Sequence, residues 1–230
     1  MLEQVDPIES FRPDPDKLCL CGKKKIFSKC CGINKLDRSP PYGVILKKNF
    51  IPSKACDNLV LYAEDKIGVD LTVRNENTLK KDSFYKEVNQ AQRVTTKVDL
   101  GEKQSIINKW TEDIYFKFLK NKIKDSIRSF EEPQLMRYVP GGFYIPHSDS
   151  DIFDQKEKKW KKIEDRDYSM LLYLNDDFEG GSLRFEFFNF TYQPRKGDLL
   201  IFPSNYLYLH EARKVERGHR YVIVSWMNVK

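Results

Sequence analysis

The spacing of apolar residues changes near residue 131 and divides the chain into two kinds of predicted structure. Before it, apolar residues recur every three or four positions, which predicts amphipathic helices over 53–67 and 102–124. After it, short apolar and aromatic runs alternate with Pro-Gly, Gly-Gly, Asn-Asp and Lys-Gly pairs, which are typical of strands and turns. Cys56 is expected to be a small buried side chain in the first helix.

A series of short strands predicts the core of the fold. The expected strands lie at 44–46, 134–139, 143–147, 168–174, 182–187, 198–202, 208–211 and 220–227. Strands in this number after a helical start predict a mainly β chain with flanking helices, built on a double-stranded β-helix or jelly-roll core. The highly charged segment 151–167 interrupts the series and is expected to be a long surface loop.

Length and charge exclude some classes of protein without selecting one. The chain of 230 residues can hold one full-sized domain and a small appendage. Its apolar runs are far shorter than the ~20 residues that a membrane-spanning helix needs, so we expect no membrane segment. The acidic, proline-containing start does not resemble a secretory signal, which predicts a cytoplasmic protein. A net charge of +6 is spread over a highly charged chain and does not indicate a dedicated nucleic-acid binder.

Four of the five cysteines fall within thirteen residues, and they are Cys19, Cys21, Cys30 and Cys31. Four thiolates can surround one Zn²⁺ tetrahedrally and so fold a segment that is too short for a core of its own. A disulfide framework is the alternative, but a cytoplasmic chain keeps its thiols reduced. Redox-active cysteines are a second alternative. The spacing also resembles the SEC-C zinc motif, which usually contacts proteins or nucleic acid, so the sequence predicts a structural zinc site.

A polar, proline-containing connector at 34–43 separates the cysteine cluster from the rest of the chain. We therefore expect two units, a zinc-binding segment over residues 1–36 and a larger domain over residues 42–230.

The larger domain contains a candidate iron site. His147 and Asp149 are two residues apart, and such residues point to the same face of a strand. His210 ends a later predicted strand. Two imidazoles and one carboxylate can occupy one face of an octahedral Fe(II) site and leave three positions open. Taken alone, a His-x-Asp pair more often marks a surface histidine beside a turn carboxylate.

Arg220 opens the last predicted strand, which is otherwise apolar. A guanidinium inside a barrel needs a partner, and a carboxylate bound by two hydrogen bonds fits its planar geometry. A surface salt bridge is the alternative, but it would not explain a position inside an apolar strand.

Several ordered blocks carry a resemblance to a known family. The blocks are 137–142, 147–149, 168–185, 194–204, His210 and 220–221. Together they resemble the Fe(II)/2-oxoglutarate-dependent dioxygenases, specifically the prolyl 4-hydroxylase-like branch. The similarity covers roughly residues 44–229, so it implies that the unit 42–230 is a dioxygenase domain.

The resemblance implies a role for each residue of the candidate site. The implied iron ligands are His147, Asp149 and His210. Arg220 would hold the distal carboxylate of 2-oxoglutarate, where many relatives have lysine and others arginine. Tyr173 and Tyr138 would add hydroxyl contacts to the cosubstrate.

Other charged residues near the site are not expected to bind metal. Asp151 lies beyond the position of the carboxylate ligand and is expected to support the site or its lid. His219 should point away from Arg220. The family often covers its site with a mobile loop after the first iron-binding strand, which is where 151–167 and Trp160 lie, although a solvated charge run without function is the alternative.

The implied reaction uses Fe(II), 2-oxoglutarate and O₂, with ascorbate as an accessory reductant, and it hydroxylates a substrate C–H bond with release of succinate and CO₂. Peptidyl proline is the expected substrate, which makes a peptide or protein the expected partner. Alternatives are another protein side chain, a small metabolite, a nucleic-acid-associated substrate, or a jelly-roll binding module without catalysis. The zinc segment is expected to be able to contact a ribosome or nucleic acid.

Overall fold

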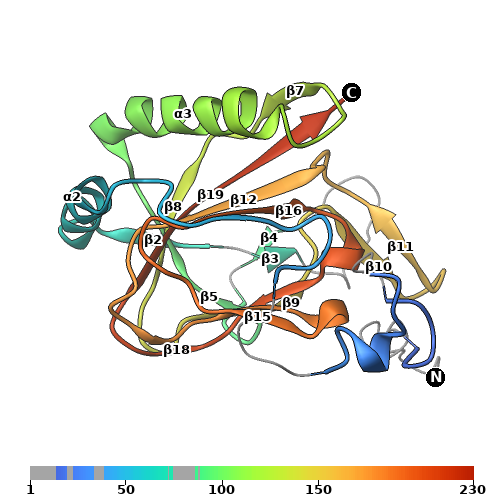
Figure 1. Ribbon diagram of the computed structural model, residues 1–230. Coiled ribbons are helices and arrows are strands. Elements are labelled where there is room, and N and C mark those ends of the chain that lie inside the picture. Colours follow the sequence, from blue (N-terminus) through green and yellow to red (C-terminus); the bar gives the residue numbers. More distant parts are fainter. Residues whose placement is uncertain (1–13, 20–22, 34–38, 72, 75–85, 88) are drawn as a thin grey trace.

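Two antiparallel sheets face each other in the computed structural model, which describes residues 14–19, 23–33, 39–71, 73–74, 86–87 and 89–230. The large sheet has the strand order β1-β16-β12-β19-β8-β6-β2, and β7 also pairs with β19. The smaller sheet has the order β15-β14-β17-β9-β5. Helices α2 and α3 cover the outer side of the large sheet (Figure 1). The predicted mainly β fold with flanking helices is confirmed.

The strand bounds define this architecture. The large sheet contains β1 (Ile45–Lys47), β16 (Leu199–Pro203), β12 (Tyr168–Tyr173), β19 (Arg220–Val229), β8 (Gln134–Tyr138), β6 (Thr96–Val98), β2 (Gly68–Asp70) and β7 (Ile127–Phe130). The smaller sheet contains β15 (Phe190–Tyr192), β14 (Leu183–Phe185), β17 (His210–Ala212), β9 (Phe143–His147) and β5 (Arg93–Val94). Separate pairs are β10 (Asp151–Asp154) with β11 (Lys159–Lys162), β13 (Glu179–Gly180) with β18 (Val215–Arg217), and β3 (Val73–Arg74) with β4 (Lys86–Glu87).

The large sheet is buried on both faces, which explains its nearly continuous apolar strands. Along β19, Val222, Val224 and Trp226 belong to the cluster between the sheets. The alternate residues Tyr221 and Ile223 belong to the cluster under the helices. Side chains alternate between the faces of a strand, so one sequence run supplies both cores.

Both predicted helices form, but they end earlier than expected. Helix α2 spans Ser53–Glu64 and buries Cys56 completely, as predicted. Because α2 ends at Glu64, Ile67 lies outside the helix and is 91% exposed, so the predicted end of this helix at residue 67 was wrong. Helix α3 (Gln104–Glu112) continues as a π-helical segment, η3 (Asp113–Leu119), and therefore ends before residue 124. Short 3₁₀ turns are η1 (Phe27–Lys29), η2 (Gly101–Lys103), η4 (Glu186–Phe188) and η5 (Tyr206–Tyr208).

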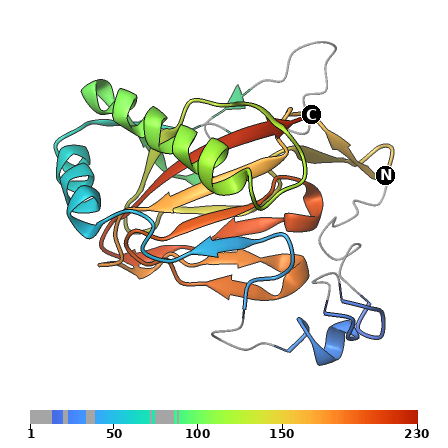
Figure 2. The ribbon, with the colours of Figure 1, turned by 45° about the horizontal axis from the view of Figure 1, so that its top comes forward.

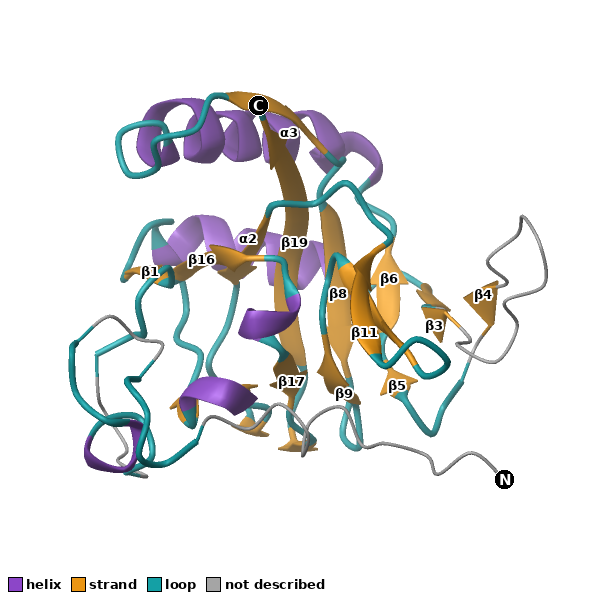
Figure 3. Ribbon diagram, turned by 90° about the vertical axis from the view of Figure 1, so that its right-hand side faces the viewer, coloured by secondary structure: helices purple, strands orange, loops and turns teal. Residues whose placement is uncertain are grey.

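The charged segment 151–167 is not a loop throughout, so that prediction was wrong in part. Residues of β10 and β11 form an antiparallel hairpin in which Phe153 pairs with Trp160. The Phe153 and Trp160 rings pack edge to face, with centroids 5.5 Å apart. Lys161 Nζ lies 2.6 Å from Asp154 Oδ2, so the charges that suggested a loop are partly paired across the hairpin. Figure 3 shows this hairpin at the open side of the two sheets.

The N-terminal segment lies beside the smaller sheet (Figure 2). Cys19 and Cys31 are buried and belong to the same apolar cluster as the barrel interior. The Asn189 side-chain amide donates a hydrogen bond of 3.4 Å to the Gly32 carbonyl. Most of the expected boundary, residues 34–38, lies outside the described residues, as does Cys21. Within the described part of the chain, no helix combines the length and the apolarity that crossing a bilayer requires.

Candidate active site

His147 and His210 lie directly opposite each other on neighbouring strands of the smaller sheet. They are register partners on β9 and β17, and their ring centroids are 4.3 Å apart. Directly opposite residues of an antiparallel pair have side chains on the same face. The sheet therefore brings together two imidazoles that are far apart in the sequence.

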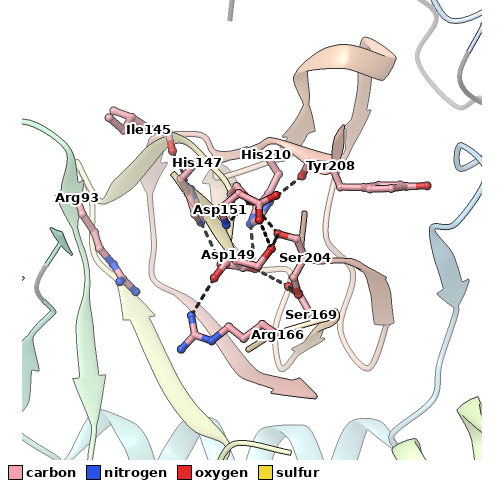
Figure 4. A network of polar contacts seen from close by, with 12 residues as sticks. Arg93, Ile145, His147, Asp149, Asp151, Arg166, Ser169, Ser204, Tyr208 and His210 are labelled. Carbon is pink, nitrogen blue, oxygen red and sulfur yellow. Dashed lines mark hydrogen bonds and ion pairs between the residues drawn. The ribbon is translucent and has the colours of Figure 1, made fainter. Parts of the chain in front are cut away.

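Each imidazole has one nitrogen held by a backbone carbonyl. His147 Nδ1 lies 2.9 Å from the Ile145 carbonyl, and His210 Nδ1 lies 3.1 Å from the Tyr208 carbonyl. A proton on Nδ1 satisfies each carbonyl and leaves Nε2 with its lone pair directed into the site (Figure 4). Both rings are thus oriented as metal ligands.

Asp149 lies next to both histidines, but the alternation of side chains along a strand does not position it. β9 ends at His147, so the argument from strand parity does not apply to Asp149. Its backbone N–H instead donates to the Ser204 carbonyl at 3.2 Å, and the Ser169 hydroxyl donates to its Oδ2 at 2.6 Å. Asp149 Oδ1 lies 3.6 Å from His147 Nε2, and Oδ2 lies 3.7 Å from His210 Nε2. One potential ligand atom from each of the three side chains lies within 4.8 Å of the others. His147, Asp149 and His210 are called the metal-ligand group below.

The protonation states suit metal binding. Burial raises the pKa of Asp149, but His210, His147 and the Ser169 hydroxyl outweigh it and hold that pKa well below its usual range. Burial and the neighbouring His147 lower the pKa of His210 to about 4. At neutral pH the site therefore offers an ionised carboxylate and a neutral imidazole, which are the forms that bind metal.

Arg220 enters the same interior from β19. It is 2% exposed, and its guanidinium carbon lies 3.9 Å from the centroid of the Tyr138 ring. One terminal nitrogen donates to the Gly181 carbonyl at 2.6 Å, whereas its buried Nε has no hydrogen-bond partner. None of the described carboxylates forms an ion pair with Arg220. A buried cation in this condition fits an anionic ligand.

A cavity of about 410 Å³ joins these groups. Its lining includes His147, Asp149, His210, Arg220, Tyr138 and Tyr173. Burial raises the pKa of Tyr173 beyond its ordinary range, so its phenol stays protonated and can donate a hydrogen bond. The structure thus brings the predicted candidates of the larger domain to one cavity.

Sequence reasoning missed several residues around the metal-ligand group. Tyr144 stacks on the His147 ring with centroids 3.6 Å apart, and the Arg93 guanidinium lies 4.6 Å from the Tyr144 ring centroid. Arg166 lies 3.8 Å from the Trp226 ring centroid and binds the Glu131 carboxylate through Nε and one terminal nitrogen. Its other terminal nitrogen donates to the Asp149 backbone carbonyl at 3.3 Å. Ser169 is also a supporting residue, and it stands out in the sequence as a hydroxyl group inside an apolar strand, but the sequence did not indicate which residue it contacts.

Asp151 and His219 do not join the metal-ligand group. Asp151 Oδ2 accepts a hydrogen bond of 2.7 Å from the Tyr206 backbone N–H, so it anchors the hairpin to the η5 turn. Trp160 stacks on Tyr206 with centroids 5.4 Å apart, which ties the hairpin to the same turn. His219 is exposed, as expected.

A second group of potential ligands lies in the N-terminal segment. The sulfur atoms of Cys19, Cys30 and Cys31 lie within 4.8 Å of one another. The fourth predicted ligand, Cys21, is outside the described residues, so the cluster is described for three cysteines.

Comparisons with known proteins agree with this geometry. Residues 133–228 match the 2OG-Fe(II) oxygenase superfamily. Prolyl 3-hydroxylase 2 of Rattus norvegicus is 33% identical over 92 residues, which are 36% of this chain and 13% of the rat protein. A PKHD-type hydroxylase of Prochlorococcus marinus is 25% identical over 165 residues, which are 68% of this chain and 70% of that protein. The chain spans 44% of a matching mimivirus protein and only 13% of the rat protein.

A solved structure has the same fold. The collagen prolyl hydroxylase of Paramecium Bursaria Chlorella virus-1, in complex with 2OG, superimposes with a TM-score of 0.58 at 23% identity. The superposition covers 80% of this chain and 95% of the viral chain. This likeness supports the predicted jelly-roll core, and the comparisons together support the predicted enzyme class, a 2-oxoglutarate-dependent dioxygenase.

The metal-ligand group predicts a difference between two histidines. His147→Ala should abolish binding of Mn²⁺ at this site, because it removes one of three ligands. His219→Ala, which changes an exposed histidine, should bind Mn²⁺ like the unchanged protein. Anaerobic titration with Mn²⁺, followed by calorimetry, measures both. Unchanged affinity in His147→Ala would remove this residue from the ligand set.

Proposed function

Because residues 133–228 match the 2OG-Fe(II) oxygenase superfamily, we propose that the protein is an Fe(II)- and 2-oxoglutarate-dependent hydroxylase of peptidyl proline that releases succinate and CO₂. The observation that carries this proposal is the convergence of the His147, Asp149 and His210 group with a buried, unpaired Arg220 on one cavity. A metal alone would not need the arginine, and an anion alone would not need the ligand group.

The donor set fits Fe(II). Two neutral imidazoles and one carboxylate are the ligands of non-haem Fe(II) oxygenases, and they leave coordination positions open. The carbonyl groups of Ile145 and Tyr208 would fix the ring orientations of the two histidines. The cavity offers room on the open side of this group.

The interior of the barrel also fits 2-oxoglutarate. The unpartnered Nε of Arg220 is a buried donor that a carboxylate would satisfy. The Tyr138 ring lies against the guanidinium and supports its position. We assign the hydroxyl groups of Tyr173 and Tyr138 to contacts with the cosubstrate.

Each part of the chain would then have a separate task in the reaction. When bound, Fe(II), 2-oxoglutarate and O₂ would supply the oxidising power for inserting one oxygen atom into a C–H bond. His147, Asp149 and His210 would hold the metal, and Arg220 would orient the cosubstrate by its distal carboxylate. Apolar wall residues such as Val222 and Leu171 would exclude water from the reaction.

Peptidyl proline is the substrate that the relatives favour. Their names include prolyl 3-hydroxylase 2 and collagen prolyl hydroxylase. Aromatic side chains line the cavity, including Tyr144, Trp160 and Trp226, and they would give a proline ring apolar surroundings. Hydroxylation of another protein side chain or of a small metabolite would use the same metal-ligand group and Arg220. A binding module without catalysis is less well supported, because loss of catalysis usually removes at least one of the three ligands or the cation.

The direct test is turnover of proline-containing peptides. The protein is incubated with Fe(II), 2-oxoglutarate, ascorbate and a panel of such peptides, and mass spectrometry follows the gain of one oxygen atom while succinate is measured in parallel. We expect peptide-dependent succinate formation matched by hydroxyproline. Succinate without peptide modification would reject the proline substrate but retain the enzyme class, and no succinate with any substrate would contradict the enzyme class.

The role of Arg220 predicts a selective effect on the cosubstrate. Hydrogen bonds to charged groups contribute about 1.5–3 kcal/mol, so Arg220→Ala should raise the 2-oxoglutarate concentration needed for half-maximal succinate formation by roughly 10- to 100-fold. Arg217→Ala removes an exposed arginine three residues earlier that pairs with Glu179. This control should leave the half-maximal 2-oxoglutarate concentration unchanged. Equal 2-oxoglutarate requirements in the two variants would refute the assignment.

We further propose that Cys19, Cys21, Cys30 and Cys31 bind one structural Zn²⁺, as a SEC-C-like segment preceding the dioxygenase domain of residues 42–230. The clustering of the three described cysteines supports this proposal. Lysines 23–25 and 29 of the same segment are exposed. Their positive charge would suit contact with a ribosome or nucleic acid, which is the role that we propose for the segment. Ascorbate use and a cytoplasmic location stay predictions.

The zinc proposal predicts different metal contents for two cysteine variants. Elemental analysis should find about one Zn per unchanged chain. Cys30→Ser should lose most of this zinc while succinate formation continues, because the cluster lies outside the iron cavity. Cys56→Ala changes a cysteine buried in α2 and should retain the zinc. A zinc-free unchanged protein would reject the proposal.

A further inference from the structure

We propose that Ser204 and Ser169 form a hydrogen-bond relay that positions the Asp149 carboxylate for metal binding. The inference rests on the proposed function and deepens it. Strand pairing does not hold the Asp149 carboxylate, and the inference names the residues that do. Both serines act through Asp149, so they are positioning residues.

The relay is buried and its distances are short. Ser169 lies in β12 and is 1% exposed, and Ser204 follows β16 directly and is 2% exposed. The two hydroxyl oxygens are 2.8 Å apart, and the Ser169 oxygen lies 2.6 Å from Asp149 Oδ2 (Figure 4). β12 and β16 are paired so that Ser169 lies opposite Phe202, which brings the start of the turn at Ser204 next to Ser169.

Counting protons fixes the direction of the relay. An ionised carboxylate can only accept, so the single Ser169 hydroxyl proton must point to Asp149. The Ser169 oxygen is then free to accept, and the single Ser204 proton supplies that bond. Each donor strengthens the next in such a chain, particularly in a buried site. The order is therefore Ser204 to Ser169 to Asp149.

The backbone carbonyl of Ser204 holds the segment 148–150, which contains Asp149. Its carbonyl accepts from the backbone N–H groups of Asp149 and Ser150, at 3.2 and 3.0 Å. It also accepts from the hydroxyl groups of Ser148 and Ser150, at 2.9 and 3.1 Å. Ser204 thus holds the Asp149 backbone through its carbonyl and the Asp149 carboxylate through its hydroxyl group.

This arrangement compensates for the end of β9. The two histidines keep their positions through the register of β9 and β17, but Asp149 lies beyond the last paired residue. With Ser169 in place, rotation of the carboxylate would break a buried, charge-assisted hydrogen bond. Alanine at position 169 would leave Oδ2 without this donor, and the carboxylate would be free to adopt orientations that do not bind metal.

The test measures metal affinity rather than turnover. The 230-residue chain is titrated anaerobically with Mn²⁺. In a separate sample the chain is loaded with Co²⁺, whose absorption spectrum reports the geometry of the ligands. Loss of a hydrogen bond to a metal ligand typically weakens metal binding by roughly 10- to 100-fold, which is the effect that we expect for Ser169→Ala. Ser169→Thr keeps a hydroxyl group and should restore most of the affinity.

The double variant tests the order of the relay. Ser204→Ala should weaken Mn²⁺ binding less than Ser169→Ala, and it should have little further effect when Ser169 is already alanine, because its hydroxyl acts through Ser169. Ser225→Ala is the matched control. Ser225 is also completely buried in the large sheet, but its hydroxyl donates to the Glu131 carbonyl at 2.7 Å, away from the metal-ligand group.

The outcomes separate this inference from the proposed function. If the unchanged protein binds no Mn²⁺, the proposed function fails. If it binds Mn²⁺ and both Ser169→Ala and Ser204→Ala bind equally well, the relay is overturned, even if thermal unfolding of the metal-free variants shows lower stability. If Ser169→Ala does not fold, the Mn²⁺ affinity of Ser204→Ala alone tests the relay. An affinity for Mn²⁺ equal to that of Ser225→Ala would then overturn it.

Discussion

The pairing of β9 with β17 is the constraint on which the site depends. It places His147 directly opposite His210, and the carbonyl groups of Ile145 and Tyr208 then turn both Nε2 atoms inward. Side chains alternate between the faces of a sheet, so a register shift of one residue would send one imidazole to the wrong side. The two histidines therefore owe their positions to the pairing of β9 with β17 and their ring orientations to two backbone carbonyls.

The large sheet determines the position of the second part of the site, the buried Arg220. Helices cover one of its faces and the smaller sheet covers the other, so the inner-face residues Val222, Val224 and Trp226 of β19 are buried. Arg220 occupies an inner position on β19, where its guanidinium contacts the Gly181 carbonyl and the Tyr138 ring and forms no ion pair with any described carboxylate. A cation placed there costs stability unless an anion joins it. The fold thus places a buried cation on the same cavity as the metal-ligand group.

The sequence predicted the chemistry better than the supporting structure. His147, Asp149, His210 and Arg220 could be found because they stand within several ordered sequence blocks that together resemble a known family, whereas the His-x-Asp pair alone would not have been sufficient. The strands β5 and β6 were missed because they contain only two or three residues of mixed polarity, too few to show a period. The hairpin of β10 and β11 was missed because its charges pair across strands, which composition does not reveal. The partners of Asp149 could not be predicted, because Ser169 and Ser204 meet it only after three separate segments have folded.

The position of a metal ion tests the account most directly. Crystals grown anaerobically with Mn²⁺ and 2-oxoglutarate would locate the metal by its anomalous scattering. We predict one strong peak in the jelly-roll interior at bonding distance, roughly 2.0–2.3 Å, from His147 Nε2, His210 Nε2 and one Asp149 oxygen, with the cosubstrate carboxylate on Arg220. A peak bound by other side chains, or an interior without metal while Arg220 pairs with the protein itself, would contradict it.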